Sequence, residues 1–376
     1  MKYYYFTFIT AVFLAFAADS TAQDYRSSIR SWNEGRLTWD DFRQESFHAD
    51  SIASAIYWSF ETFPVKKRYG NLTVSKLESH LLMDKTLSWV RPDCMTGHYL
   101  KYPQIIFDIA ELYRRKFQSE IDRTPNLYRQ LFSFYDNACD KSIEEFKFLS
   151  DSGDNTEQIS IYERKINKEL ENSAAADNIP KFSCRDFGAS FNAGVNCEVF
   201  YGNAGKLFSP ATLFNLGTSL SYKESFFDVE MLMGGGKVRN TFTANDYTWD
   251  KGDGYSHLNI SLQYTYALFD NDNWKIGPFI GIGGLVHSCN KTEEEREDEN
   301  IDNTIGQYNA MAGVNISWKI RRRLSLVYGF PDSKGNYMEN MLRFKIYAAR
   351  SQFCPDFAGY SINFSLTFSV FARLLK

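Results

Sequence analysis

The side chains best suited to metal or proton chemistry lie between residues 93 and 111 of the sequence. Asp93, Cys94 and His98 offer a carboxylate, a thiol and an imidazole, and such groups bind zinc in proteins. Asp108 and Glu111 follow, and we expect them to be helix-surface or hydrogen-bond network residues rather than catalysts. A single histidine beside a loop cysteine is usually unliganded, so a metal site is the minor interpretation. The other histidines, His48, His80, His257 and His287, are isolated and form no ligand motif.

A helix must position Asp108 and Glu111. In LKYPQIIFDIAELYRRKF, residues 100–117, Ile106, Ile109, Tyr113 and Phe117 recur at helical spacing. Proline is tolerated in the first turn, so we expect this helix to begin near Pro103. The same spacing predicts further helices within 127–135 and 159–170. Before them, IASAIYWSFETF indicates a strand, and KLESHLLMDKTLSWV indicates a strand or a short helix.

The first 22 residues are typical of a cleaved signal peptide. Lys2 precedes an apolar stretch, and the small residues Ser20 and Ala22 suit signal peptidase. The alternative is an uncleaved membrane anchor. The formal net charge of −4 argues against nucleic acid as a partner, because no basic excess is present to neutralise phosphates. Six cysteines in an exported chain permit disulfides, and Cys289 with Cys354 would fall in loops on one side of the architecture proposed below.

From about Arg185 onward the hydrophobic period changes to two. In SHLNISLQYTYALF the residues Leu258, Ile260 and Leu262 share one face, while the polar residues between them share the other. YSINFSLTFSVF, residues 360–371, alternates in the same way. Such long segments, separated by turn residues, are typical of a transmembrane β-barrel.

About eight segments fit this pattern. They are 185–200, 211–222, 226–238, 255–269, 274–287, 307–320, 324 to about 330, and 359–373. MLRFKIYAAR, residues 341–350, also alternates and could be a loop hairpin or further strands. Short connectors (YKES, FDNDN, IRRR) alternate with long ones, as in outer-membrane barrels. The alternative is a soluble β-sandwich, whose strands are usually shorter.

The sequence therefore predicts a multi-domain chain: signal peptide 1–22, periplasmic α+β domain 23–176, linker 177–184 and barrel 185–376. The barrel half resembles the small OmpA-like outer-membrane barrels of diderm bacteria. That resemblance implies a lipid-facing outer surface, a periplasmic amino-terminal domain and an outward-facing acidic loop, KTEEEREDENID (291–302). The acidic run is expected to be a solvated loop rather than a cation site.

The amino-terminal half resembles a family of predicted secreted zinc-dependent peptidases. LTWDDFRQ (37–44) matches a family opening of the form L-x-W-x-D-F, and residues 102–111 align with the family motif H-E-Q-G-H-F-D-I-A-E. Gln104, Asp108 and Glu111 agree with that motif. The resemblance covers roughly residues 30–175 and implies a zincin-like fold.

The residues that would carry the family's chemistry are replaced. In H-E-x-x-H two histidines bind zinc and the glutamate takes a proton from the bound water. Here Tyr102, Pro103 and Ile106 stand at those positions. A third family histidine, in a T-x-H-G-like segment, corresponds to Ser152. The resemblance therefore implies a pseudo-peptidase with no cofactor.

We thus expect an outer-membrane barrel with a catalytically inactive periplasmic domain that binds or scaffolds a protein partner. One alternative keeps a metallopeptidase with a non-standard site that uses His98. Another makes the barrel's outer loops an adhesin or ligand-binding surface.

Overall fold

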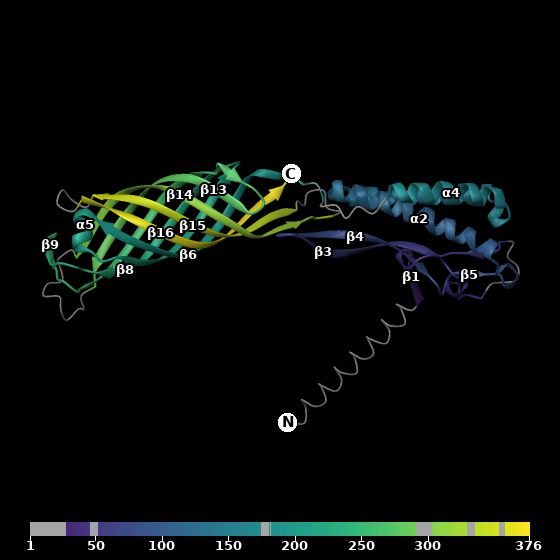
Figure 1. The fold of residues 1–376 in the computed structure, drawn as a ribbon, viewed down its shortest axis with the longest axis horizontal. Coiled ribbons are helices and arrows are strands. Elements are labelled where there is room, and N and C mark those ends of the chain that lie inside the picture. The colour runs from purple at the N-terminus through teal and green to yellow at the C-terminus, as the bar shows by residue number, and fades with distance from the viewer. Residues whose placement is uncertain are drawn as a thin grey trace, which may run out of the picture. The chain divides into compact units, whose positions relative to one another are not determined.

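The computed structural model describes residues 28–45, 52–173, 180, 182–290, 303–328, 335–352 and 358–376. The chain divides into two compact units (Figure 1). One takes the described residues of Met1–Val65, Lys76–Lys181 and Val327–Ser333, and the other takes those of Lys66–Ser75, Phe182–Leu326 and Lys334–Lys376. Each unit thus includes a short segment that the sequence-based division assigns to the other half. The predicted signal peptide and the acidic loop 291–302 lie outside the described residues.

The first unit begins with short strands and a long hairpin. Strands β3 (Trp58–Tyr69) and β4 (Leu72–Asp84) pair with each other around Gly70, whose φ of 60° suits a glycine. The segment that could have been a strand or a short helix is therefore a strand as far as Asp84. The smaller elements are β1 (Ile29–Ser31), η1 (Trp32–Glu34), η2 (Trp39–Asp41), β2 (Ser54–Ala55), β5 (Trp89–Val90) and η3 (Pro92–Cys94).

Three long helices follow: α2 (Gly97–Arg123), α3 (Tyr128–Leu149) and α4 (Thr156–Asn172), with η4 (Pro125–Leu127) and η5 (Asp151–Gly153) between them. The predicted start of α2 near Pro103 is wrong, since the helix begins at Gly97 and Pro103 lies inside it. Proline removes one backbone hydrogen bond from a helix interior. All residues from Tyr102 to Leu112 are buried, so packing of this segment outweighs that loss.

Eight long antiparallel strands form the second unit. The pairing order is β14–β15–β16–β6–β7–β8–β11–β13, and it returns to β14 because β13 also pairs with β14. The described strands therefore make a β-barrel. They are β6 (Cys184–Tyr201), β7 (Ala211–Tyr222), β8 (Ser225–Lys237), β11 (Gly254–Tyr266), β13 (Trp274–Cys289), β14 (Thr304–Ser325), β15 (Asn336–Gln352) and β16 (Ala358–Leu375). Short elements in the connectors are α5 (Gly202–Leu207), β9 (Phe242–Ala244), β10 (Tyr247–Trp249) and β12 (Phe269–Asp270).

The predicted seventh strand is wrong. Residues 307–320 and the start of the predicted seventh segment, Leu324 and Ser325, belong to one strand, β14, which passes a register shift between Lys319 and Arg321 without turning. A bulge of this kind adds a residue and bends the strand but does not reverse it. The seventh strand is β15, which contains MLRFKIYAAR. IRRR is therefore no connector, and most of residues 331–357, between the seventh and eighth predicted segments, lies in β15.

The segment 66–75 packs against β14 inside the second unit. β4 pairs in parallel with β14, from Arg322 opposite Leu72 to Ser325 opposite Ser75. Arg322 Nε donates to Asn71 Oδ1 at 3.0 Å, and Asn71 Nδ2 donates to the Asp272 carbonyl at 2.7 Å. An apolar cluster covers this pairing: Leu72, Val74, Leu324, Tyr337 and Leu375.

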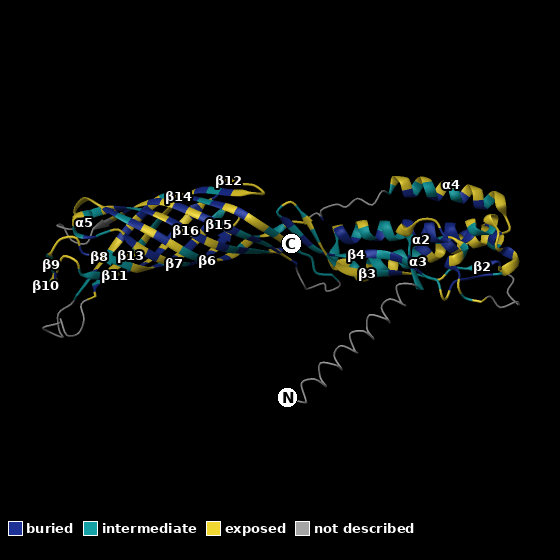
Figure 2. Cartoon of the chain, turned by 60° about the horizontal axis from the view of Figure 1, so that its bottom comes forward, coloured by how far each residue is buried: buried dark blue, intermediate teal, exposed yellow. Residues whose placement is uncertain are grey.

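The barrel strands separate polar side chains from apolar ones. Bands of buried and exposed residues alternate along them in Figure 2. The polar face predicted from the sequence is the buried one, as for Asn192, Asn259, Gln263 and Asn363. The exposed face carries large apolar residues, among them Phe191, Phe214, Ile260, Ile282, Val314, Ile346 and Phe364.

Paired charges lie among the buried polar side chains. Lys345 Nζ donates to Glu230 Oε1 at 2.6 Å and to Gln263 Oε1 at 2.7 Å. Asp228 lies 3.4 Å from Lys345 Nζ and 3.3 Å from Arg343 Nη1. Two carboxylates thus face two cations. Nearer one end of the barrel, Lys275 and Lys319 contact Glu339 at 3.0 and 2.7 Å.

Loss of Lys345 should destabilise the barrel strongly. Lys345→Met leaves Glu230 buried without its cation, and breaking a buried pair in this way costs about 3–5 kcal/mol. Adding Glu230→Gln removes the uncompensated charge and should recover most of the loss. The measurement is the urea concentration at the midpoint of unfolding for the full-length protein in detergent. Unfolding is monitored by the heat-modifiable electrophoretic mobility of the barrel.

Ile346→Met, a volume-conserving change on the exposed face of the same strand, is the matched control and should cost less than about 1.5 kcal/mol. Equal midpoints for Lys345→Met and this control would contradict the assigned role of the buried pair.

Candidate functional site

The motif residues of α2 lie in a hydrogen-bond network beside the amino-terminal segment. Asp108 Oδ1 accepts from Trp32 Nε1 at 2.7 Å and from Gln104 Nε2 at 2.9 Å. Gln104 Oε1 in turn accepts from the backbone N–H of Leu37 at 2.7 Å. Gln104 and Asp108 therefore hold residues 32–37 against the helix, one helical turn apart on the same face.

Glu111 is held by two arginines. Its Oε1 and Oε2 accept from Arg114 Nη2 and Nε, both at 2.7 Å, and Oε1 also accepts from Arg115 Nε at 2.8 Å. Arg114 Nη1 continues to the Ser79 carbonyl of β4 at 2.8 Å, and Arg115 Nη1 to the Leu170 carbonyl of α4 at 2.9 Å. Glu111 thus positions Arg114, which contacts β4, and Arg115, which contacts α4.

Asp41 of LTWDDF has a similar structural role. Arg30 Nη1 lies 2.8 Å from its Oδ2 and Lys85 Nζ lies 3.2 Å from its Oδ1. The Thr38 backbone N–H donates to the same carboxylate at 2.9 Å. Burial by itself would raise the pKa of Asp41, but these contacts lower it below the ordinary value. The carboxylate therefore joins β1, η2 and the end of the hairpin.

The positions where the peptidase family would carry its ligands are filled by packed side chains. Tyr102 is only 2% exposed, and its ring stacks on Phe146 with centroids 5.5 Å apart. Ser152, which stands where the third family histidine would be, lies beside the Tyr102 hydroxyl. Pro103 and Ile106 are buried in the same helix. The structure thus brings Tyr102 and Ser152 together, with Tyr102 in the core and Ser152 only partly buried.

The alternative ligands do not converge. Cys94 is buried and accepts from Arg91 Nη2 at 3.3 Å, and Asp93 pairs with the same arginine at 2.9 Å. His98 is exposed and contacts the Tyr99 ring. Within the described ranges, no group of three histidine, cysteine, aspartate or glutamate residues is arranged to hold a metal ion.

The predicted Cys289–Cys354 disulfide remains untested. Cys289 ends β13 and is buried, with its Sγ 3.6 Å from Asp253 Oδ2, whereas Cys354 lies outside the described residues.

The charged network in the barrel was not predicted from the sequence. Its members come from β8, β11 and β15, and up to 117 residues separate the paired side chains. A local signal was present, because Asp228 and Glu230 stand two residues apart on one strand, and Arg343 and Lys345 do so on another. Charges at that spacing share a strand face, so they could have been assigned to the interior.

The arrangement defines a β-barrel with a filled, charge-paired interior, attached to an α+β unit. Searches with protein-family models and among curated proteins find no match. The resemblance to zinc-dependent peptidases therefore stays a prediction. No helix in the described ranges is long and apolar enough to cross a membrane.

Among solved structures, the barrel resembles small outer-membrane barrel proteins. One is Ail, the attachment invasion locus protein of Yersinia pestis, solved with the heparin analogue sucrose octasulfate: it is 9% identical over 51% of this chain and 99% of that chain, with a TM-score of 0.30. Neisserial surface protein A is 10% identical over 51% and 99%, with a TM-score of 0.28. The amino-terminal barrel domain of Pseudomonas aeruginosa OprF is 8% identical over 50% and 99%, with a TM-score of 0.22.

Substitutions at Asp108 should separate its acceptor role from its charge. Asp108→Ala leaves the Trp32 and Gln104 donors without a partner, which costs about 1–3 kcal/mol for a buried group. Asp108→Asn keeps the acceptor oxygen. Chemical unfolding of the full-length protein in detergent, monitored by tryptophan fluorescence, gives the free energy of unfolding of each variant.

The pH dependence provides a second readout. Burial raises the pKa of Asp108, although its hydrogen bonds from Trp32 and Gln104 lower it in part. A raised folded-state pKa contributes stability at low pH that is lost as the pH rises through that pKa. Asp108→Asn cannot ionise, so it should gain stability relative to the unsubstituted protein as the pH rises. A constant difference between the two proteins would contradict this assignment.

Proposed function

We propose that this protein is an outer-membrane β-barrel that carries a non-catalytic, peptidase-like unit in the periplasm, where that unit binds or scaffolds a protein partner. The observation that carries the proposal is the burial of Tyr102, Pro103 and Ile106, which stand at the replaced positions of the helix motif, in a packed core. A core of this kind leaves no open coordination position for a metal-bound water.

The membrane location is supported by the outward surface of the barrel. The outward positions of β16 from Tyr360 to Val370 are all apolar or aromatic, and those of β15 from Leu342 to Ala348 are uncharged. Exposed aromatic residues gather towards one end, including Tyr222, Tyr266, Trp274 and Trp318. An apolar band bordered by aromatic residues is the pattern that a bilayer requires of a barrel.

The lumen does not support a wide channel. Its polar residues are buried against one another, and Lys345, Glu230 and Asp228 are each almost fully inaccessible. Eight strands enclose little more than their own side chains. The barrel is therefore better suited to anchoring than to transport.

The binding role is supported by exposed apolar side chains on α3. Phe148 is 85% exposed and Phe134 is 63% exposed, and both lie on the same helix as the buried Phe146. Phe134 and Phe148 are fourteen residues apart, so they share one stripe of the helical surface, and Leu127, 43% exposed, lies just before the helix begins. Aromatic side chains on a free face are typical of a protein contact.

The topology is tested by protease treatment of cells that make the full-length protein. We expect fragments of the first unit to survive in intact cells and to be digested once the outer membrane is permeabilised, while the barrel remains in the membrane fraction. Digestion of the first unit in intact cells, or recovery of the chain in the soluble fraction, would reject the proposed location.

The lack of peptidase chemistry is tested on the purified full-length protein. Zinc analysis should find no stoichiometric metal, and His98→Ala should bind the same trace amount as the unsubstituted protein. Tight stoichiometric zinc, or peptide cleavage that a chelator abolishes, would refute the non-catalytic assignment and favour a non-standard metal site.

A further inference from the structure

Arg350 places a cation on the outward face of the barrel, above its apolar band. Arg350 follows the uncharged outward positions of β15 and is exposed, while its neighbours Ala349 and Tyr347 are buried. In the strand register it lies opposite Ala310 of β14 and Tyr360 of β16. Its guanidinium forms no ion pair or hydrogen bond within the part of the chain that the structure describes.

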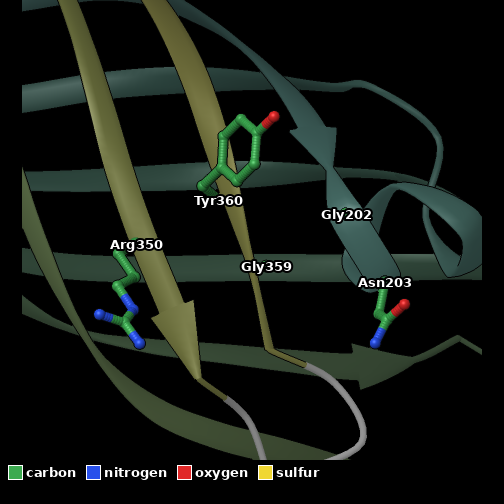
Figure 3. A pocket seen from close by; sticks show the side chains of 5 residues that line it. All are labelled: Gly202, Asn203, Arg350, Gly359 and Tyr360. Carbon is green, nitrogen blue, oxygen red and sulfur yellow. The ribbon is translucent and has the colours of Figure 1, made fainter.

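On one side of Arg350 lies a small pocket at the rim of the barrel (Figure 3). Its volume is about 430 Å³, and it is lined by Gly202, Asn203, Arg350, Gly359 and Tyr360. Gly202 and Gly359 contribute no side chains to the pocket. The Tyr360 ring stacks on Tyr201 with an interplanar angle of 9°. The pocket therefore combines a cation, an amide and a phenol at the end of the barrel that bears α5.

On the other side of Arg350 an apolar groove runs across the outer wall. Its volume is about 770 Å³, and its lining includes Ile260, Ile282, Gly284, Tyr308 and Ala310 as well as Arg350. Gly284 contributes no side chain to the groove, and a Cβ built there meets no atom within 4 Å. Small residues between large ones leave a groove that an alkyl chain can fill.

We propose that Arg350 and this groove form a binding site for an anionic, phosphate-bearing membrane lipid. The phosphate pairs with the Arg350 guanidinium at the rim pocket, and one acyl chain lies in the groove beside Gly284. A guanidinium and a phosphate match in charge and in bidentate geometry. The apolar groove that begins at the same arginine gives the lipid tail a defined path, which free phosphate could not use.

This site rests on the proposed membrane location, because only a bilayer presents lipid to the outer wall. The depth of Arg350 fits that setting. A long cationic side chain near the end of an apolar band reaches the headgroup level while its methylene groups stay on apolar surface.

The site is tested by native mass spectrometry of the full-length protein released from mixed nanodiscs of phosphatidylglycerol and phosphatidylcholine with identical acyl chains. We expect phosphatidylglycerol to be retained preferentially, and Arg350→Gln to lower that preference about tenfold, as for the loss of one charge-assisted contact. Gly284→Leu places a side chain in the groove, at a position where a Cβ meets no atom within 4 Å, and should reduce retention of both lipids.

Two substitutions serve as matched controls. Arg323→Gln removes an exposed cation from the far end of β14, and Gly306→Leu enlarges another exposed glycine, whose Cβ has Val286 no closer than 4.0 Å. Both should bind lipid as the unsubstituted protein does. Equal retention of the two lipids by the unsubstituted protein, or equal losses in Arg350→Gln and Arg323→Gln, would overturn the proposal.

Inorganic phosphate added at millimolar concentration tests whether the anion that binds Arg350 is free phosphate rather than a lipid headgroup. If it displaces phosphatidylglycerol completely and Gly284→Leu has no effect, the site binds free phosphate and the lipid assignment is wrong. Failure of the proposed function is distinguishable, since a chain that does not enter the membrane lacks heat-modifiable mobility, whereas loss of lipid preference alone leaves that mobility intact.

Discussion

The structure of the barrel depends on one constraint: each strand must place every second residue in a polar interior and the others on an apolar exterior. Because successive side chains point to opposite faces, a polar residue in the wrong register would be turned to the outside. The interior then has to satisfy its own polar groups. Pairing of Lys345 with Glu230, and of Arg343 with Asp228, meets that requirement across strands that are distant in sequence.

The first unit solves a different problem with the same kind of contact. α2 is buried from Tyr102 to Leu112, so its polar residues must find partners inside the unit. Gln104, Asp108 and Glu111 do so by binding the amino-terminal segment, the hairpin and α4. Gln104, Asp108 and Glu111 therefore have a structural role, since they hold neighbouring elements of the unit against α2.

The sequence predicted most of the barrel because period two is a local property that can be read along each strand. It failed at 320–323, where a run of arginines resembled a turn but lies in a bulged strand that pairs with residues 72–75. The start of α2 was missed because burial, which local sequence does not reveal, overrides the effect of Pro103. The partners of Asp108 and Lys345 were missed for a related reason: Trp32 is 76 residues from Asp108, and Glu230 is 115 residues from Lys345.

The contact of Asn71 with Arg322 joins residues that are 251 positions apart. Contacts of such long range carry a large loop-closure cost before they contribute stability, and they form slowly in folding. β4 can pair with β14 only after the later strand exists, so the tip of the β3–β4 hairpin must wait for most of the barrel. The polar turn at Gly70 and Asn71 keeps that tip solvated until then, whereas Leu72 and Val74 become buried only when Leu324 and Tyr337 are in place. Assembly of this segment is therefore coupled to completion of the barrel.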